Sequence, residues 1–88
     1  MKQEKENSEP EKILVNLYGG LESYSPDGSR RDNILSADSV ECTGDIIDFF
    51  QIPSDEIQVI LINGRHADRD TSVKAGDEVS LFPLVGGG

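Results

Sequence analysis

A single stretch with the apolar period of a helix stands between stretches with the period of strands, and this order constrains the fold most. In "TGDIIDFFQI" at 43–52, apolar residues recur at spacings of three and four, which places them on one side of a short helix. They are Ile46, Ile47, Phe49 and Phe50. Thr43 is the predicted N-cap, and Pro53 is predicted to end the helix.

Four other stretches have the composition and period of strands. They are "KILVNLY" at 12–18, "ILSADSVE" at 34–41, "IQVILIN" at 57–63 and "VSLFPLV" at 79–85. The first alternates strictly, which is typical of a strand with one buried face, and the second alternates imperfectly. The third is apolar and β-branched nearly throughout, which predicts a central strand covered on both sides.

Turn residues separate these stretches and complete the predicted order. The segment 19–33 contains Pro26-Asp27-Gly28 and is predicted to be a long loop. Asn63-Gly64 is a strong hairpin signal and predicts a short return strand, which a turn at Ala75-Gly76-Asp77 separates from the last strand. The order is then strand, strand, helix, strand, short strand, strand. It predicts an α+β fold, with a mixed sheet of four to five strands packed on one main helix.

The charge of the chain excludes two classes of partner. The formal net charge is −9, and most of the acidic excess lies from Ile13 onward. Nucleic acids and anionic membrane surfaces are bound through Lys and Arg, so we expect neither as a partner. A partner with a basic face fits the charge, and so does a purely solubilising role.

The residues with the richest chemistry are isolated in the sequence. Cys42 is the only cysteine, so the fold does not depend on a disulfide, and we expect a buried or idle thiol in a reducing compartment. His66 is the only histidine, and we expect no metal site there. No stretch is long enough to cross a membrane and no signal peptide opens the chain, so the expected location is the cytoplasm.

The pleat of the last strand predicts what its two faces do. Val79 and Leu81 share one face, while Ser80, Phe82 and Leu84 share the other. Because Ser80 suggests contact with water, Phe82 and Leu84 are predicted to be exposed apolar groups that mark a docking surface. The alternative is that both faces are covered and that Phe82 belongs to the core.

The end of the chain, "VGGG", is predicted to leave the domain as an extended peptide with small side chains and a terminal carboxylate that can be activated. Pro83 lacks a backbone N–H and weakens further sheet pairing, so Leu84 to Gly88 can extend away. A peptide without side chains can thread a narrow slot in a partner enzyme. The functional group at its tip is the α-carboxylate of Gly88, which ATP could activate as a mixed anhydride with AMP for displacement by sulfur. The alternative is a linker remnant or a frayed tail.

The second half of the chain, "VILINGRHADRDTSVKAGDEVSLFPLVGGG", resembles the MoaD/ThiS sulfur carriers, which are ubiquitin-like proteins of the β-grasp fold. The helix at 43–52 and the first strand also stand where that family places them, so the resemblance covers residues 13–88. The matching pieces are Asn63-Gly64, Asp70-Thr71, Gly76-Asp77-Glu78-Val79, Phe82-Pro83 and Gly87-Gly88.

The resemblance implies a β-grasp carrier protein that partner enzymes act on, and not an enzyme. Gly88 would be adenylated by an ATP-dependent enzyme of the ubiquitin-activating type and converted to a thiocarboxylate, with ATP used by the partner and no cofactor bound here. The thiocarboxylate would donate sulfur in molybdopterin or tungsten-pterin synthesis, on the large subunit of a molybdopterin synthase whose small subunit the chain would be. The residues implied to contact partners are Phe82, Pro83, Leu84, Val85, Gly86 and Gly87.

Two further functions and the domain layout complete the predictions. The sulfur could go to a thiazole synthase for thiamine, or the chain could be a protein modifier joined to lysines through Gly88. A plain binding module with an idle tail is the third reading. Residues 1–12 are predicted to be a disordered tail of mixed charge, 13–85 the β-grasp domain and 86–88 a flexible glycine tail.

Overall fold

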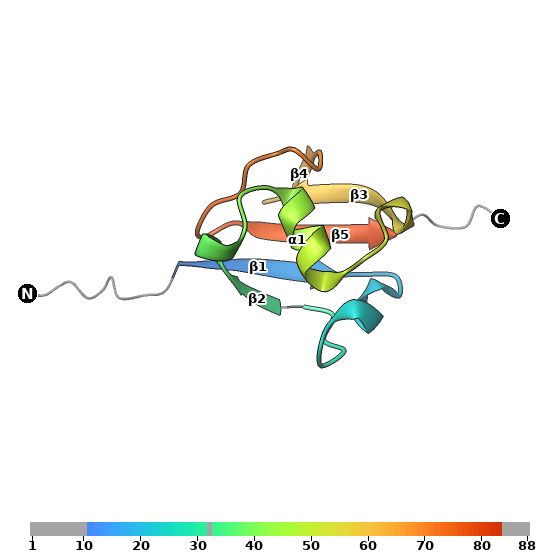
Figure 1. The fold of residues 1–88 in the computed structure, drawn as a ribbon. Coiled ribbons are helices and arrows are strands. Elements are labelled where there is room, and N and C mark those ends of the chain that lie inside the picture. The colour runs from blue at the N-terminus through green and yellow to red at the C-terminus, as the bar shows by residue number, and fades with distance from the viewer. Residues whose placement is uncertain (1–10, 32, 84–88) are drawn as a thin grey trace, which may run out of the picture.

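The computed structural model describes residues 11–31 and 33–83, which form one mixed sheet with one α-helix (Figure 1). The strands are β1 (Lys12–Leu17), β2 (Asn33–Ser36), β3 (Ile57–Ile62), β4 (Arg65–Ala67) and β5 (Glu78–Pro83). The helix is α1 (Thr43–Phe50), and three short 3₁₀ helices are η2 (Leu21–Tyr24), η3 (Ala37–Ser39) and η4 (Ser54–Glu56). The predicted order of elements is therefore confirmed, with five strands.

The strands lie in the order β2-β1-β5-β3-β4, so the last strand of the chain occupies the centre of the sheet. β1 pairs with β5 in parallel, and the other three pairings are antiparallel. A parallel pair needs a crossover connection, and the segment that contains α1 supplies it. This arrangement gives the mixed sheet with a single main helix that the sequence predicts.

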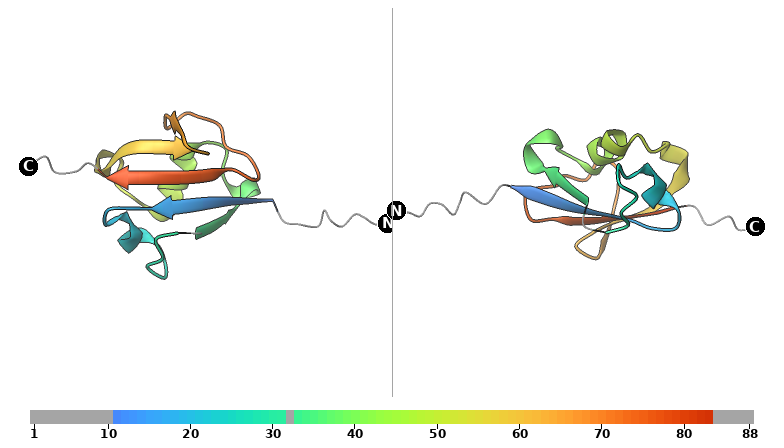
Figure 2. Two further views of the ribbon diagram at one scale, coloured as in Figure 1. Left: turned by 180° about the vertical axis from the view of Figure 1, so that it is seen from behind. Right: turned by 90° about the horizontal axis from the view of Figure 1, so that it is seen from below.

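The core lies between the sheet and α1, which crosses one face of it (Figure 2). The alternation in the first strand is confirmed, because Ile13, Val15 and Leu17 are all fully buried. β5 contributes Val79 and Leu81 beside them. We call the sheet face that carries these residues the covered face and the opposite face the open face.

The two ends of α1 differ from their predictions. Thr43 is the first helical residue and Cys42 is the N-cap; the Thr43 side chain is fully buried and its hydroxyl donates to the carbonyl oxygen of Asp68. The helix ends at Phe50 because Gln51 adopts the left-handed conformation, with φ 60° and ψ 39°. Pro53 therefore does not end the helix, as predicted, but follows its C-cap by two residues.

Burial differs from the sequence pattern in α1 and in β3. Phe49 leaves the apolar side of the helix and is 52% exposed, because the helix is short and its core-facing positions are filled by Ile46, Ile47 and Phe50. The third strand, β3, is not covered on both sides. Its partner strands are β5 and β4, and its residues Val59 and Leu61 lie half-buried on the open face.

The hairpin at Asn63-Gly64 is confirmed and has a role beyond the turn. Both residues have positive φ, 53° and 85°, as a two-residue turn of this kind requires. The Asn63 side chain donates to the Asp77 carboxylate at 3.0 Å and accepts from the Glu78 N–H at 3.0 Å. Asp77 is therefore buried, and Glu78 is the first residue of β5.

Candidate functional site

The candidate site is the carboxyl end of β5, where the chain leaves the middle of the sheet (Figure 1). The neighbouring strand holds this end in place, since the Tyr18 N–H donates to the Leu81 carbonyl oxygen at 3.1 Å. On the other side, Val59 is the register partner of Phe82 and Ile57 that of Pro83. The last residues of β5 are thus fixed by neighbouring strands on both sides before the chain leaves the sheet.

The two faces of β5 separate as the pleat predicts. Val79 and Leu81 are completely buried on the covered face. Phe82 lies half-buried on the open face, so the prediction of its face is confirmed and the alternative that it belongs to the core is wrong. Its ring stacks on that of Tyr18, with 4.8 Å between ring centroids and 10° between the ring planes. The stacking holds Phe82 in one orientation while part of its surface stays accessible.

Pro83 is held by a second contact that the sequence analysis missed. Gly19 has φ +63°, and a Cβ placed there would lie 2.5 Å from Cγ and 2.8 Å from Cδ of Pro83. A residue with a side chain would therefore have to displace the proline ring. The adjacent pair Gly19-Gly20, within the predicted loop 19–33, was the available signal.

A carboxylate fixes the backbone that carries Gly19. The Gly20 N–H donates to the Glu22 carboxylate at 2.9 Å. Hydrogen bonds from the backbone N–H groups of Glu22 and Gly20 lower the pKa of the Glu22 carboxyl, and Arg30, at 3.5 Å, lowers it further. Glu22 therefore stays ionised at neutral pH and supports the turn that packs on Pro83.

The open face around this exit combines an apolar rim with a polar centre. Tyr18, Phe82 and Val59 form the rim nearest the exit. Behind them the Asn16 amide donates to the Glu78 carboxylate at 2.7 Å and to the Ser80 hydroxyl at 3.4 Å. Asn16 is 1% exposed, so this network satisfies a buried polar group instead of serving as a binding site. The accessible part of the face is the apolar rim beside the exit.

The remaining predicted site residues fall beyond the described part of the chain. Leu84, Val85, Gly86, Gly87 and Gly88 lie outside the described residues, as does nearly all of the predicted tail 1–12. Their roles, and the predicted domain boundaries, stay predictions. The structure places Phe82 and Pro83, and it places them at the point from which the terminal residues continue.

The isolated reactive residues stay isolated in the fold. Cys42 is half-buried at the N-cap of α1, and His66 is exposed on β4. Within residues 11–31 and 33–83 no group of three His, Cys, Asp or Glu side chains could hold a metal ion. In the same ranges, no helix has the length and apolar character needed to span a membrane.

Comparison with known families identifies the fold. The model of the Mut7-C ubiquitin family matches residues 10–86. The chain belongs to this family. The match includes every strand, the helix and the whole described exit of β5, so the ubiquitin-like β-grasp fold that the sequence suggested is confirmed. A comparison with curated protein sequences returned no match.

Solved structures place this family member among small ubiquitin-like proteins. Two structures of small archaeal modifier protein 1 from Haloferax volcanii share 27% identity with it, each with a TM-score of 0.66. They cover 84% and 88% of this chain and 98% and 99% of their own. Urm1 from Trypanosoma brucei, at 19% identity and a TM-score of 0.57 over 91% of this chain and 98% of its own, shares the fold. The resemblance to ubiquitin-like proteins of the MoaD/ThiS type is thereby confirmed.

Proposed function

We propose that this ubiquitin-like protein is a sulfur carrier whose C-terminal Gly88 is adenylated and then converted to a thiocarboxylate. The observation that carries the proposal is the exit of β5: a rigid, partly exposed Phe82–Pro83 end stands immediately before five residues that finish in three glycines. The match to a ubiquitin-like family and to small modifier structures supports the same use of the terminus.

The chemistry requires only the terminal carboxylate from this chain. A Gly88 carboxylate oxygen attacks the α-phosphorus of ATP, pyrophosphate leaves, and an acyl adenylate forms. A hydrosulfide sulfur then attacks the acyl carbon and displaces AMP, which leaves a thiocarboxylate. The partner enzyme supplies the groups that stabilise charge in both steps. The thiocarboxylate sulfur then attacks an electrophilic carbon of the acceptor. Water attacks the acyl carbon of Gly88, the bond between that carbon and the sulfur breaks, the sulfur stays on the acceptor and the carboxylate is restored.

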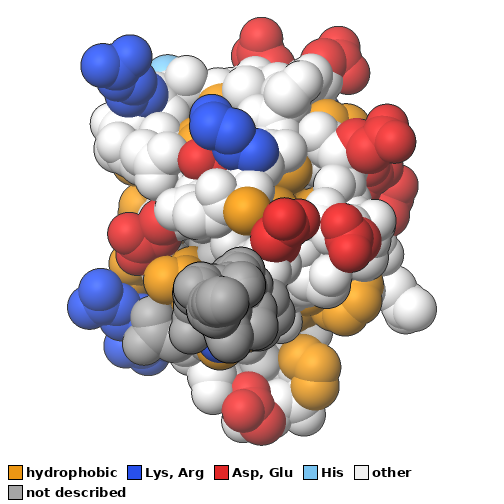
Figure 3. Space-filling view, turned by 90° about the vertical axis from the view of Figure 1, so that its left-hand side faces the viewer, with side chains coloured by type: hydrophobic (Ala, Val, Ile, Leu, Met, Phe, Trp, Pro, Cys, Tyr) orange, Lys and Arg blue, Asp and Glu red, His pale blue; other side chains and the backbone are white. Residues whose placement is uncertain are grey.

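The open face supplies the surface for the activating partner. Phe82 and Tyr18 present a rigid aromatic pair at the base of the terminal peptide, and such anchors dominate the energy of protein interfaces. The net charge of −9 favours a basic partner surface. At the end of the molecule opposite to the exit, Asp and Glu side chains crowd the right side of the view in Figure 3, while Lys and Arg lie chiefly on its left. The proposed partner is an ATP-dependent adenylating enzyme of the ubiquitin-activating type.

The acceptor of the sulfur follows from the resemblance to the MoaD/ThiS carriers. The first choice is a molybdopterin or tungsten-pterin precursor on the large subunit of a molybdopterin synthase, and the alternative is a thiazole synthase for thiamine. Because two structures of a small archaeal modifier protein match the chain over nearly their whole length, conjugation of Gly88 to lysines of other proteins is the second candidate function.

Intact mass of the full chain separates these functions. The chain is incubated with ATP, Mg²⁺, sulfide and an activating enzyme of the ubiquitin-activating type from its own genome. A sulfur carrier gains about 16 Da, the difference between sulfur and oxygen, at its terminus. A modifier instead forms higher-mass adducts with other proteins. The matched control lacks Gly87 and Gly88, and a mass gain that persists in that control, or no change in the full chain, would contradict the proposal.

A further inference from the structure

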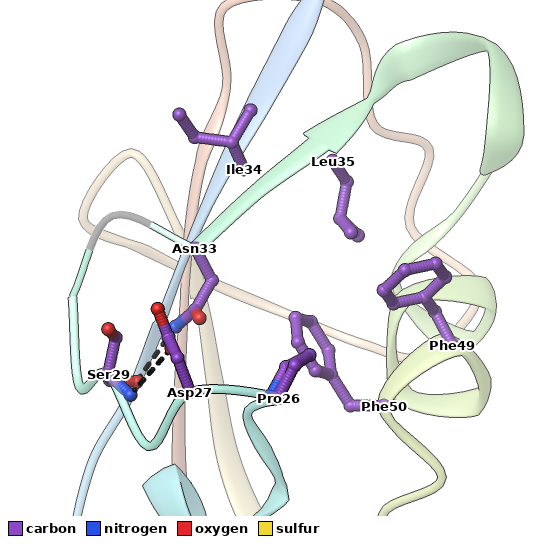
Figure 4. Close-up of a pocket in the computed structure, with 8 residues that line it drawn as sticks. All are labelled: Pro26, Asp27, Ser29, Asn33, Ile34, Leu35, Phe49 and Phe50. Carbon is purple, nitrogen blue, oxygen red and sulfur yellow. Dashed lines mark hydrogen bonds between the residues drawn. The ribbon is translucent and has the colours of Figure 1, made fainter.

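A groove lies at the β2 edge of the sheet, between β2, α1 and the loop that follows η2 (Figure 4). It encloses about 370 Å³. Leu35 and Phe49 point toward each other across it, from the strand and from the helix, while Pro26 and Phe50 lie at its lower end (Figure 4). The lining is predominantly apolar, and none of it belongs to the rim around Phe82.

The two large apolar side chains that stay exposed in the described residues both line this groove. Ile34 is 56% exposed and Phe49 is 52% exposed. The Phe49 ring meets that of Phe50 edge to face, at 5.2 Å between centroids, so it is held over the groove instead of lying free on the surface. Phe49 therefore presents an exposed apolar ring over the groove, whereas the side chain of Ile34 points to the opposite face of β2 from that of Leu35 (Figure 4).

β2 also presents backbone hydrogen-bonding groups at the edge of the sheet. It pairs with β1 alone, and the Ala37 N–H donates to the Glu11 carbonyl oxygen at 2.8 Å just beyond it. Since inward and outward residues alternate along an antiparallel strand, Ile34 directs its N–H and C=O groups to the outer edge. Ser36 faces the same edge, and its carbonyl oxygen accepts from the Ser39 hydroxyl at 2.7 Å. An edge strand with such groups is a template for another extended chain.

The charge in the groove favours a cation. Asp27 is the one charged residue among those that line it. The Ser29 N–H and the Ser25 hydroxyl donate to its carboxylate, at 3.0 and 2.9 Å. Hydrogen bonds from Ser29 and then Ser25 lower the pKa of the Asp27 carboxyl, so it is ionised at neutral pH.

We propose that this groove binds an extended peptide segment of a partner protein, which pairs with the outer edge of β2. The segment is aliphatic at alternate positions, so that every second side chain enters between Leu35 and Phe49. It carries a Lys or Arg that meets Asp27. A second copy of this chain is a poorer occupant, because two molecules of net charge −9 repel each other.

A displayed library of random twelve-residue peptides tests the proposal on the full chain. The library is selected on the wild-type protein and depleted on a Phe49→Glu chain. We expect enrichment of sequences that alternate Val, Ile or Leu with other residues and that carry Lys or Arg at one end. The best enriched peptide, made synthetically, is then titrated into ¹⁵N-labelled protein. The amide shifts are expected in β2 and α1.

Three substitutions sharpen the titration. Phe49→Glu weakens the enriched peptide at least about tenfold, because it removes the apolar wall. Asp27→Asn keeps the side chain's shape and weakens the peptide a few-fold, and the loss disappears when the peptide's Lys or Arg is replaced by Gln. Leu61→Ser, on the open face, leaves peptide binding unchanged. Thermal melts establish whether each variant is folded. If Phe49→Glu does not fold, the comparison of wild type with Asp27→Asn tests the proposal by itself.

Three outcomes overturn the proposal. The first is a selection in which no peptide binds the wild-type chain better than the Phe49→Glu chain. The second is a set of shifts centred on the open face around Phe82. The third is self-association of the free chain in sedimentation that Phe49→Glu abolishes, which would make a second copy the occupant. None of these touches the terminal carboxylate, so the thiocarboxylate assay can succeed or fail independently.

Discussion

The two faces of the sheet use apolar side chains for different purposes, and β5 shows the difference within one strand. Leu81 is completely buried against the core under α1, whereas its neighbour Phe82 is half-buried and braced by a single aromatic ring. The covered face therefore stabilises the fold, and the open face at the exit offers a rigid surface to a partner. The comparison separates residues that hold the domain together from residues that act on another protein.

The largest expected effect is on the covered face. Leu81→Ala removes a side chain that is fully buried, and it should lower the free energy of unfolding by about 3 kcal/mol. Leu61→Ala, on the half-buried open face, should cost about 1 kcal/mol. Urea denaturation followed by circular dichroism measures both. Equal losses for the two variants would remove the distinction between the faces.

The contact between Gly19 and Pro83 gives the next largest effect. Gly19→Ala should lower the free energy of unfolding by about 2 kcal/mol, because it combines a positive φ with a close approach to the proline ring. Gly28→Ala is the matched control, since Gly28 has φ +76° and open space around it. It should cost only about 1 kcal/mol. If both variants lose the same stability, Gly19 does not hold the exit.

Phe82→Ala should affect the partner more than the fold. Loss of the stacked ring should cost about 1 kcal/mol of stability, because one aromatic pair is removed from a surface that is only half-buried. The kcat/KM of adenylation should fall about tenfold or more if Phe82 is an interface anchor. Kinetics with the activating enzyme, at a temperature where the variant is fully folded, measure the effect. An unchanged kcat/KM would leave Phe82 as a structural residue.

The smallest effect concerns pH at the same exit. The pKa of Glu22 is lowered in the folded protein from 4.5, so its ionised form contributes stability above that pH, and the contribution is lost as the pH falls through the folded pKa. Thermal melts should therefore give a higher melting temperature for wild type than for Glu22→Gln at pH 7, and the difference between the two should shrink toward pH 3. A difference independent of pH would mean that the charge of Glu22 is not what supports the turn.

Much of the fold could be predicted because its signals are local. Alternation in the first strand, the Asn63-Gly64 hairpin and the pleat of the last strand each follow from residues a few positions apart, and each is confirmed. The face of Phe82 followed from the same alternation. Its stacking on Tyr18 could not, because it depends on the parallel pairing of strands from opposite ends of the chain.

The predictions that were wrong depend on contacts between distant segments. Phe49 has the spacing of a core residue, but a helix of eight residues fills its core-facing side without it. Thr43 has the composition of an N-cap, but its hydroxyl is taken by the Asp68 carbonyl oxygen from a later loop. The Gly19–Pro83 contact joins residues that no local pattern relates. Local periodicity thus fixes elements, and tertiary packing decides which residues remain available for function.

Exchange of radiolabelled pyrophosphate into ATP, catalysed by the activating enzyme, tests the central claim most directly. Three forms of the chain are compared: the native chain, a chain whose last residue is made as the Gly88 carboxamide by ligation, and the native chain with Phe82→Ala. The account predicts exchange with the native chain, none with the carboxamide and reduced exchange with Phe82→Ala. Exchange that continues with the carboxamide, or that never appears with the native chain, would contradict it.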